Sequence, residues 1–278
     1  MMTLSQHSTA DGGPMPRITV IIPARYGSSR FPGKPLAPIA GVPMLERVWR
    51  LARALDGVSQ VAVATDDRRI ADLVQGFGGE VIMTPESCRN GTERALAAID
   101  TMTEQPDVVL NLQGDAVLTP PWILGALVDA MRADSAVPMA TPAVRMTAGQ
   151  VADLVQSKAD GQVGGTTVTF DHSHKALYFS KRVIPFIRGE HDDPPVYRHI
   201  GLYAYRTDIL RRLCNLPMGP LEQVEQLEQL RALEHGIPIK VVEVDYRGRT
   251  HWSVDAPEDV TMVEKLIAEE GELVEDLA

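Results

Sequence analysis

The sequence ITVIIPARYGSSRFPGKPL, residues 18–36, decides how this chain folds. Its first five residues are all β-branched and predict a buried strand, which ends at Pro23 because proline cannot donate to a strand ladder. The loop that follows holds small residues and three cations, Arg25, Arg30 and Lys34. Small side chains let backbone N–H groups approach an anion, so this loop predicts a phosphate site at the carboxyl end of the first strand, where open α/β sheets bind ligands.

The phosphate loop fits neither of the two common glycine motifs. The chain contains no G-x-x-x-x-G-K-[ST] and no G-x-G-x-x-G pattern, which disfavours a P-loop NTPase and a standard Rossmann dinucleotide site. From loop composition alone, a solvated basic loop after a strand stays open as the alternative.

Composition indicates an ordinary globular protein. The chain has 278 residues, 44% of them hydrophobic and 23% charged, which suits one α/β domain. Its net charge of −10 argues against a nucleic-acid partner, so the cations of the phosphate loop are a local concentration. The two cysteines, Cys88 and Cys214, lack metal-ligand spacing and predict neither a disulfide framework nor a zinc site.

Location is predicted from what the sequence lacks. No apolar run has transmembrane length, and residues 1–16 are polar without the apolar core of a signal peptide. We therefore expect a cytoplasmic protein without a membrane partner, in which residues 1–16 form a disordered N-terminal extension and residues 17–278 a single domain.

Strands and helices alternate through the first half. The patterns predict strands at 58–64, 80–83 and 108–112 and helices at 43–55, 68–77 and 92–102. This alternation predicts a Rossmann-like, mostly parallel sheet flanked by helices, an α/β fold. From about residue 144 the pattern changes, and it predicts strands at 164–170, 176–179, 200–205 and 239–244 and helices at 207–213, 221–235 and 255–270.

Two aspartates from distant segments predict a metal site. Asp115 follows an apolar strand in the segment NLQGD, and Asp255 lies in WSVDAPED near the end of the chain. Transfer at a polyphosphate needs a divalent cation held by hard oxygen ligands, usually one or two carboxylates plus substrate phosphates. The residues alone leave a second interpretation open, in which Asp115 is a turn residue and Asp255 a helix N-cap.

The segment Asn90-Gly91-Thr92-Glu93-Arg94 precedes a predicted helix. Thr92 suits a helix cap, and Arg94 is then expected to point into the nucleotide site. A capped surface helix is the alternative, and for Glu93 it is the preferred interpretation.

Residues 21–36 closely resemble the opening of the sugar nucleotidyltransferases, and within them the 3-deoxy-manno-octulosonate (Kdo) cytidylyltransferases. That family's I-I-P-A-R-x-x-S-x-R-x-P-G-K-P-L segment wraps the triphosphate of CTP, and every fixed position is present here. The resemblance covers roughly residues 18–267. It implies a magnesium-dependent transfer of CMP from CTP to an acidic sugar, Kdo in the first place, which gives CMP-Kdo for lipopolysaccharide and releases pyrophosphate. It also implies a homodimer, with residues 144–206 as an acceptor-binding and dimerisation subregion that carries an antiparallel β extension.

The resemblance assigns roles to individual residues. It implies Mg²⁺ ligands at Asp115 and Asp255 and catalytic roles for Arg25, Lys34 and Asp115. The nucleotide-binding residues that it implies are Pro23, Ala24, Arg25, Gly27, Ser28, Arg30, Lys34, Asn90, Gly91, Thr92, Arg94 and Gln113. The segments 198–206 and 221–231 resemble the family's R-H-x-G-x-Y-x-Y-R strand and L-E-x-x-E-x-L-E-Q-L-R helix. The acceptor-binding residues implied there and beside them are Lys181, His199, Tyr203, Glu228 and Gln229.

Some positions depart from the family pattern. Ala116 stands where Glu usually follows Q-G-D, Gly165 begins the segment where a V-K-V-V strand is usual, and Lys181 replaces an arginine whose planar fork a lysine lacks. These changes leave open another acidic acceptor, such as amino-Kdo, a different ulosonic acid or a phosphonate. A non-catalytic nucleotide-binding homologue also stays open, whereas the missing glycine fingerprint disfavours a nicotinamide-dependent oxidoreductase.

Overall fold

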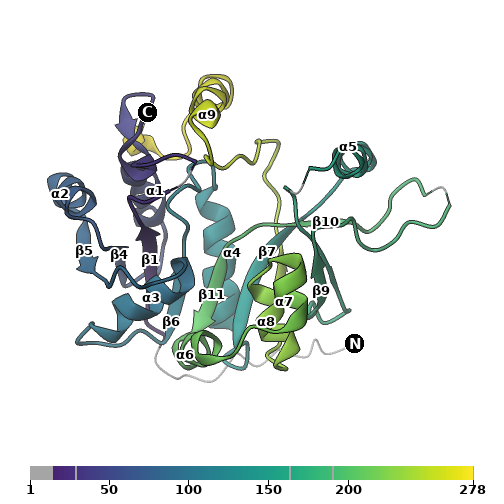
Figure 1. The fold of residues 1–278 in the computed structure, drawn as a ribbon, viewed down its shortest axis with the longest axis horizontal. Helices are drawn as coiled ribbons and strands as arrows, with labels where there is room; N and C mark the ends of the chain where they lie inside the picture. The colour runs from purple at the N-terminus through teal and green to yellow at the C-terminus, as the bar shows by residue number, and fades with distance from the viewer. Residues whose placement is uncertain (1–14, 29, 163, 190, 278) are drawn as a thin grey trace, which may run out of the picture.

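A computed structural model describes residues 15–28, 30–162, 164–189 and 191–277. The extension predicted at 1–16 lies almost wholly outside the described residues. At the centre is a ten-stranded sheet in the order β5-β4-β1-β6-β11-β7-β10-β8-β9, with β12 paired to β7 (Figure 1). Its strands are β1 (Ile18–Ala24), β4 (Gln60–Thr65), β5 (Glu80–Met83), β6 (Val108–Asn111), β7 (Met139–Arg145), β8 (Thr167–Phe170), β9 (Ala176–Ser180), β10 (Tyr197–His199), β11 (Tyr203–Arg206) and β12 (Lys240–Glu243).

The first half of the sheet is parallel, as the alternating pattern predicts. Strands β5, β4, β1 and β6 pair in parallel, with Ile21 opposite both Ala62 and Asn111. Every residue of β1 is buried, which agrees with its mainly apolar side chains. Because β1 and β6 end side by side, the loops that follow them begin at one edge of the sheet.

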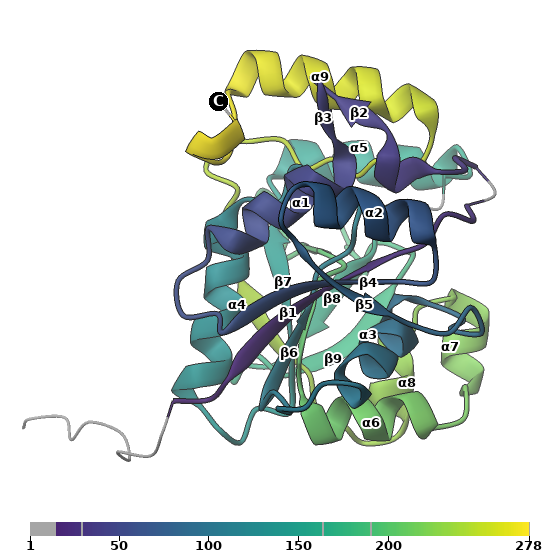
Figure 2. The same ribbon diagram turned by 90° about the vertical axis from the view of Figure 1, so that its left-hand side faces the viewer.

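Helices cover both faces of the sheet (Figure 2). One face carries α1 (Met44–Arg53), α2 (Arg68–Gly76), α4 (Pro121–Ala133) and α9 (Pro257–Glu270). The other carries α3 (Gly91–Asp100), α6 (Thr207–Asn215) and α8 (Gln229–Glu234), with α7 (Pro220–Glu225) against α8. Helix α5 (Ala148–Ala159) packs two buried side chains, Val151 and Leu154, into a separate small cluster. The minor elements are β2 (Pro38–Ile39), β3 (Val42–Pro43) and the 3-10 helices η1 (Lys34–Leu36) and η2 (Glu275–Leu277).

Two predicted elements are wrong in the second half. The strand predicted at 200–205 begins only at Tyr203, as β11, and a separate strand that was not predicted, β10, precedes it; both are antiparallel to β7. The helix predicted at 221–235 is broken between α7 and α8, because Gln226 adopts a left-handed conformation with φ 52° and ends α7. The break places Glu228 and Gln229 at the start of the second helix.

Within the described residues, no helix is both long and apolar enough to span a bilayer.

Candidate active site

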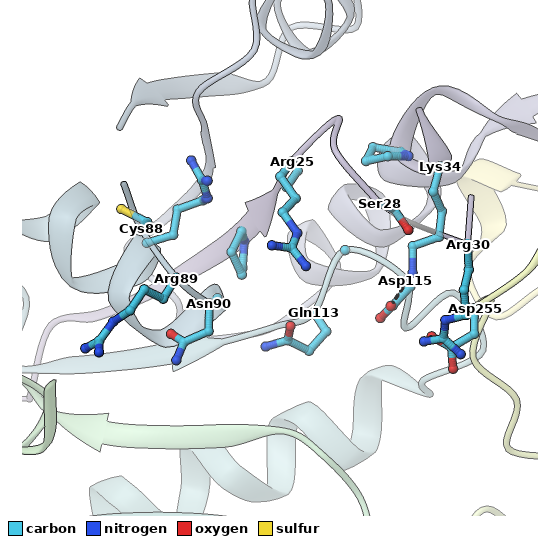
Figure 3. A pocket seen from close by; sticks show the side chains of 16 residues that line it. Arg25, Ser28, Arg30, Lys34, Cys88, Arg89, Asn90, Gln113, Asp115 and Asp255 are labelled. Atoms are coloured by element: carbon cyan, nitrogen blue, oxygen red, sulfur yellow. Dashed lines mark hydrogen bonds and ion pairs between the residues drawn. The ribbon is translucent and has the colours of Figure 1, made fainter. Parts of the chain in front are cut away.

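A cavity of about 310 Å³ opens where the strands β1 and β6 end (Figure 3). The loops after these strands form its walls, together with the segments that lead into α3 and α9. Its lining residues are Pro23, Ala24, Arg25, Ser28, Arg30, Lys34, Pro35, Cys88, Arg89, Asn90, Gly91, Arg94, Gln113, Gly114, Asp115 and Asp255. The structure thus brings the phosphate loop, both predicted metal aspartates and most of the predicted nucleotide contacts into one cavity.

The phosphate loop folds back on itself at Gly33. This residue has φ 73°, and its backbone N–H donates to the carbonyl of Tyr26 at 2.9 Å. A Cβ here would lie 3.0 Å from the Tyr26 ring, so glycine is required for both conformation and space. The turn directs Arg25, Arg30 and Lys34 toward the same cavity.

One end of the cavity is ionic. The Nζ of Lys34 lies 2.7 Å from Oδ2 of Asp115 and donates to the carbonyl of Val254 at 2.8 Å (Figure 3). Arg30 pairs with Asp255 at 2.9 Å. Cations and carboxylates therefore neutralise one another across the cavity, in a protein whose net charge is −10.

The helix-cap interpretation of Asp255 is wrong. The carboxylate of Asp259 accepts the backbone N–H groups of Asp255 and Ala256, both at 2.8 Å, and so satisfies the start of α9. The Asp255 side chain is left to face the cavity and Arg30.

The residues at the ionic end fit a magnesium ion. Asp115 and Asp255 supply hard oxygens, and their side chains keep 28% and 45% exposure, so the carboxylates are accessible. Among the described residues no group of three or more His, Cys, Asp or Glu side chains could hold a metal. A divalent cation here would need phosphate oxygens to complete its coordination, as Mg²⁺ typically does.

The opposite end of the cavity carries amides. The Oδ1 of Asn90 accepts the backbone N–H of Glu93 at 2.8 Å, so Asn90 caps α3 and the cap predicted at Thr92 is wrong. Gln113 donates to Asn111 at 3.3 Å and reaches the cavity beside Asn90 (Figure 3). At Gly91 a Cβ would lie 3.0 Å from Pro23 and 3.1 Å from Oε1 of Gln113, which excludes a side chain at that point.

Three predicted nucleotide contacts are placed differently. Arg94 lines the cavity but is only 3% exposed, and its guanidinium binds Asp66 and Thr84, both at 2.6 Å. Gly27 does not line the cavity, and Thr92 lines a neighbouring one instead. The charge of Arg94 therefore stabilises the wall and is already neutralised by Asp66.

Cys88 and Arg89 line the cavity but were not predicted to do so. Burial raises the pKa of the Cys88 thiol, and the Nε of Arg89 donates to Glu93 at 2.6 Å. Both directly precede the Asn90-Gly91 segment. Because that segment was predicted to bind the nucleotide, its two preceding residues could have been predicted to line the same cavity.

A second cavity of about 230 Å³ adjoins the first and shares Asn90, Gly91 and Gln113 with it. Its other lining residues are Thr92, Met139, Gly201, Tyr203, Tyr205, Leu213, Glu228 and Gln229. Three of the five predicted acceptor contacts thus lie together, whereas Lys181 and His199 line neither cavity.

The second cavity is walled by largely buried hydrogen-bonding groups. Gln229 is 4% exposed, and its amide nitrogen has no hydrogen-bond partner. Burial raises the pKa of Glu228 above its usual value, and burial also raises that of Tyr203. An unpaired buried donor is costly, so this wall suits a ligand that brings several hydroxyl groups.

His199 supports this wall from behind. It is 8% exposed and lies 2.8 Å from the hydroxyl of Thr141, and its ring packs 5.6 Å from that of Tyr203. Burial, together with the nearby charge of Lys181, lowers its pKa to about 3, so the imidazole is neutral at physiological pH.

Two glutamates outside the predicted set hold the acceptor wall together. Glu222 binds Arg231 through two hydrogen bonds of 2.6 and 2.7 Å, which join α7 to α8. Glu225 accepts the hydroxyl of Ser180 at 2.7 Å and the backbone N–H of Lys181 at 2.8 Å. The spacing of the glutamates in 221–231 could have indicated that they act together. A continuous helix through Gln226, however, would have predicted the wrong positions for the Glu222 and Glu225 side chains.

Comparisons with known proteins found similar chains over most of the sequence. A family described as cytidylyltransferase matches residues 19–241. The chain is 56% identical to a 3-deoxy-manno-octulosonate cytidylyltransferase of Maricaulis maris, over 92% of this chain and 99% of that one. It is 44% identical to an 8-amino-3,8-dideoxy-manno-octulosonate cytidylyltransferase of Shewanella pealeana, over 89% of this chain and 97% of that one. A solved CMP:2-keto-3-deoxy-manno-octonic acid synthetase complexed with CTP superposes with a TM-score of 0.82 at 37% identity, covering 91% of this chain and 99% of that one.

Proposed function

Because this chain belongs to the cytidylyltransferase family, we propose that it is an enzyme that transfers CMP from CTP to Kdo and releases pyrophosphate. The observation that carries the proposal is the shared wall of the two cavities. Asn90, Gly91 and Gln113 separate an ionic cavity suited to a triphosphate from a polar one suited to a sugar. An α-phosphate beside this wall is within reach of an acceptor hydroxyl.

On the nucleotide side the chain's own residues position and neutralise the triphosphate. Arg25, Arg30 and Lys34 face the cavity as fixed cations. They stabilise the charge that builds on the leaving pyrophosphate, which is the main requirement of transfer at phosphorus. Asn90 and Gln113 offer amide donors and acceptors to the base and the ribose.

Magnesium belongs to the proposal. Asp115 and Asp255 would hold Mg²⁺ at the ionic end, where Lys34 and Arg30 now pair with them. When bound, the ion would neutralise phosphate charge and lower the pKa of the attacking hydroxyl. Lys34 and Arg30 are then free to turn from the carboxylates to the phosphates.

On the acceptor side Tyr203, Glu228 and Gln229 orient the sugar. The unpaired amide of Gln229 gains a partner when a hydroxyl or carboxylate arrives, so binding removes an existing cost. His199 remains neutral and holds Tyr203 in place.

A second candidate acceptor is 8-amino-Kdo, because two Shewanella relatives named for it are 44% identical to the chain. Ala116 and Lys181 depart from the usual Kdo pattern, which motivates the comparison. Kinetics with Kdo and 8-amino-Kdo side by side would decide between the two acceptors by their ratio of kcat/KM.

A homodimer is also part of the proposal. The segment between β9 and β10 projects away from the sheet (Figure 1), and it exposes 86% of Phe186. Leu177 on β9 is 62% exposed. Apolar side chains in such positions are typical of subunit contacts. Light scattering should give twice the mass of one chain, and a monomer that is fully active would contradict the dimer.

The direct test of the function is pyrophosphate release from each of the four ribonucleoside triphosphates, with and without Kdo. We expect release with CTP and Kdo together in the presence of Mg²⁺, and only background release in the other mixtures. Stable CTP binding without release on any acid sugar would indicate a non-catalytic homologue and overturn the proposal.

A further inference from the structure

Asp255 lies in the segment that joins β12 to α9, and this segment is attached to its surroundings on both sides of Asp255. Before Asp255, the backbone N–H of Thr250 donates to the Glu270 carboxylate at 3.1 Å. Val254 is fully buried, and its carbonyl accepts a hydrogen bond from Nζ of Lys34 at 2.8 Å. After Asp255 the chain enters α9. The backbone between Val254 and α9 therefore determines where the Asp255 carboxylate lies.

Asp259, in the first turn of α9, uses both of its carboxylate oxygens on this segment. Its Oδ2 accepts the backbone N–H groups of Asp255 and Ala256, both at 2.8 Å. Its Oδ1 accepts the indole N–H of Trp252 at 3.0 Å. A helix cap needs only the contact with the Ala256 N–H. The bond to Trp252 goes further, because it fixes the rotation of the carboxylate that holds the backbone of Asp255.

Trp252 owes little to burial. It is 37% exposed, although tryptophan is one of the side chains that gain most from leaving water. Its directed contact is the indole N–H that meets Asp259. No phenyl or aliphatic side chain supplies such a donor, so the hydrogen bond is the feature that favours tryptophan here.

Asp259 is not suited to bind a metal itself. Its two oxygens already accept three N–H donors, and it is not among the described residues that line the first cavity. Asp255 differs, because its carboxylate faces the cavity and pairs with Arg30, a cation that can turn to a phosphate. The two aspartates thus divide the work between holding the segment and facing the ligand.

We propose that Trp252 and Asp259 are positioning residues for Asp255. Their hydrogen bond holds the Asp255 backbone so that its carboxylate is directed to a divalent cation at the ionic end of the cavity. The inference rests on the proposed function, since it takes Asp255 as a Mg²⁺ ligand. Mg²⁺ demands near-ideal octahedral geometry, so a site with two protein carboxylates tolerates little displacement of either. Contacts that orient a metal ligand commonly change metal affinity by about tenfold or more.

The test is the affinity for Mn²⁺, which prefers oxygen ligands as Mg²⁺ does. The EPR signal of the free ion measures it with the full chain and CTP present and no sugar, so the result does not depend on turnover. Trp252→Phe removes one N–H donor and keeps an aromatic ring, and it should weaken Mn²⁺ binding about fivefold. Asp259→Asn presents an amide N–H₂ to the indole N–H and should weaken binding about tenfold. The double variant should bind no more weakly than Asp259→Asn, because both changes break the same bond.

Trp122→Phe is the matched control. The indole N–H of Trp122 donates to the carbonyl of Asp245 at 2.9 Å, so it holds the same connecting segment well before Asp255. Its loss should leave Mn²⁺ binding unchanged. Melting temperatures show whether each variant is folded, and a role limited to capping α9 would lower them without changing the Mn²⁺ affinity. In turnover, Trp252→Phe should raise the Mg²⁺ concentration for half-maximal rate about fivefold and leave the KM for Kdo unchanged.

Asp255→Asn separates failure of this inference from failure of the metal assignment. If Asp255→Asn weakens Mn²⁺ binding and Trp252→Phe does not, the positioning role is overturned while the metal site stands. A loss in Trp122→Phe equal to that in Trp252→Phe would also overturn it, because the effect would not be specific to the contact with Asp259. If Asp255→Asn binds Mn²⁺ as tightly as the unmodified chain, Asp255 is not a ligand, and both the metal assignment and the positioning role are overturned.

Discussion

The two adjoining cavities recognise their ligands by different physics. The first is bordered by ion pairs on loops, such as Lys34 with Asp115, whose charged side chains stay partly exposed. The second is bordered by largely buried polar groups, such as Gln229, which come from strands and helices far apart in the sequence. A triphosphate needs concentrated charge, which a short loop supplies, whereas a sugar needs directional partners, which only a folded wall can hold at fixed positions.

This difference predicts that variants of the two cavities change different kinetic parameters. Changes at the ionic end should reduce kcat, because they act on charge that develops in the transition state. Changes at the acceptor wall should act mainly on the KM for the sugar, because they remove contacts already present in the ground state.

The largest effect is expected from Asp115→Asn and Asp255→Asn. Each removes one anionic oxygen from a site with two carboxylates, so kcat should fall about a thousandfold with the fold intact. Initial rates of pyrophosphate release measure this, with Asp129→Asn on the exposed side of α4 as the control. Near-normal activity in either variant would remove that aspartate from the metal site.

A smaller effect, about a hundredfold in kcat, is expected from Lys34→Ala. The loss removes one preorganised cation from the triphosphate, and the KM for the sugar should not change. Lys265→Ala, on the exposed surface of α9, is the matched control. A variant altered only in its KM for Kdo would place Lys34 on the acceptor side. That result would contradict the assignment of the first cavity to the triphosphate and the second to the sugar.

Gln229→Leu should raise the KM for Kdo about tenfold and leave the KM for CTP unchanged, since a buried donor to the sugar is lost while volume is kept. Steady-state kinetics with each substrate varied in turn provide the measurement. The exposed Gln223→Leu is the control on the neighbouring helix. Equal changes in both KM values would show that the wall is shared rather than specific to the acceptor.

The last prediction concerns the stability of the fold rather than the kinetics, and how it depends on pH. His199 has its pKa lowered from 6.5 to about 3, so its neutral form contributes stability above pH 6.5 that is lost as pH falls toward 3. The free energy of unfolding should decline by about 1.4 kcal/mol per pH unit for this one proton. His199→Gln should reduce that slope in urea titrations between pH 4 and 6.5, and His172→Gln on an exposed turn should not. A slope unchanged in His199→Gln would contradict a buried neutral imidazole.

Sequence reasoning succeeded where function depends on local segments. The phosphate loop, Asp115 and the Asn90-Gly91 segment each follow a strand or precede a helix, so the parallel alternation alone brings them to one sheet edge. The predicted elements up to residue 112 agree with the structure within about two residues at each boundary.

Predictions from the sequence were wrong or incomplete where tertiary contacts decide the conformation. The periodicity of 221–231 continues across Gln226, but the Glu222–Arg231 ion pair and the burial of Leu227 favour a break there. For Arg94 the pattern indicated the correct cavity but not its ion pair with Asp66, because Asp66 follows a different strand and no local signal indicates the pair. Lys181 and His199 line neither cavity for the same reason, since strand alternation predicts which face of the sheet a side chain is on but not which neighbours cover it.

The most direct test of the two-cavity account is a crystal structure of the enzyme with CTP, Mg²⁺ and a Kdo analogue that lacks the attacking hydroxyl. The account predicts the triphosphate against Arg25, Arg30 and Lys34, the sugar against Glu228 and Gln229, and the α-phosphate beside Gly91 and Gln113. A sugar bound outside the second cavity, or a triphosphate that does not contact the loop after β1, would contradict it.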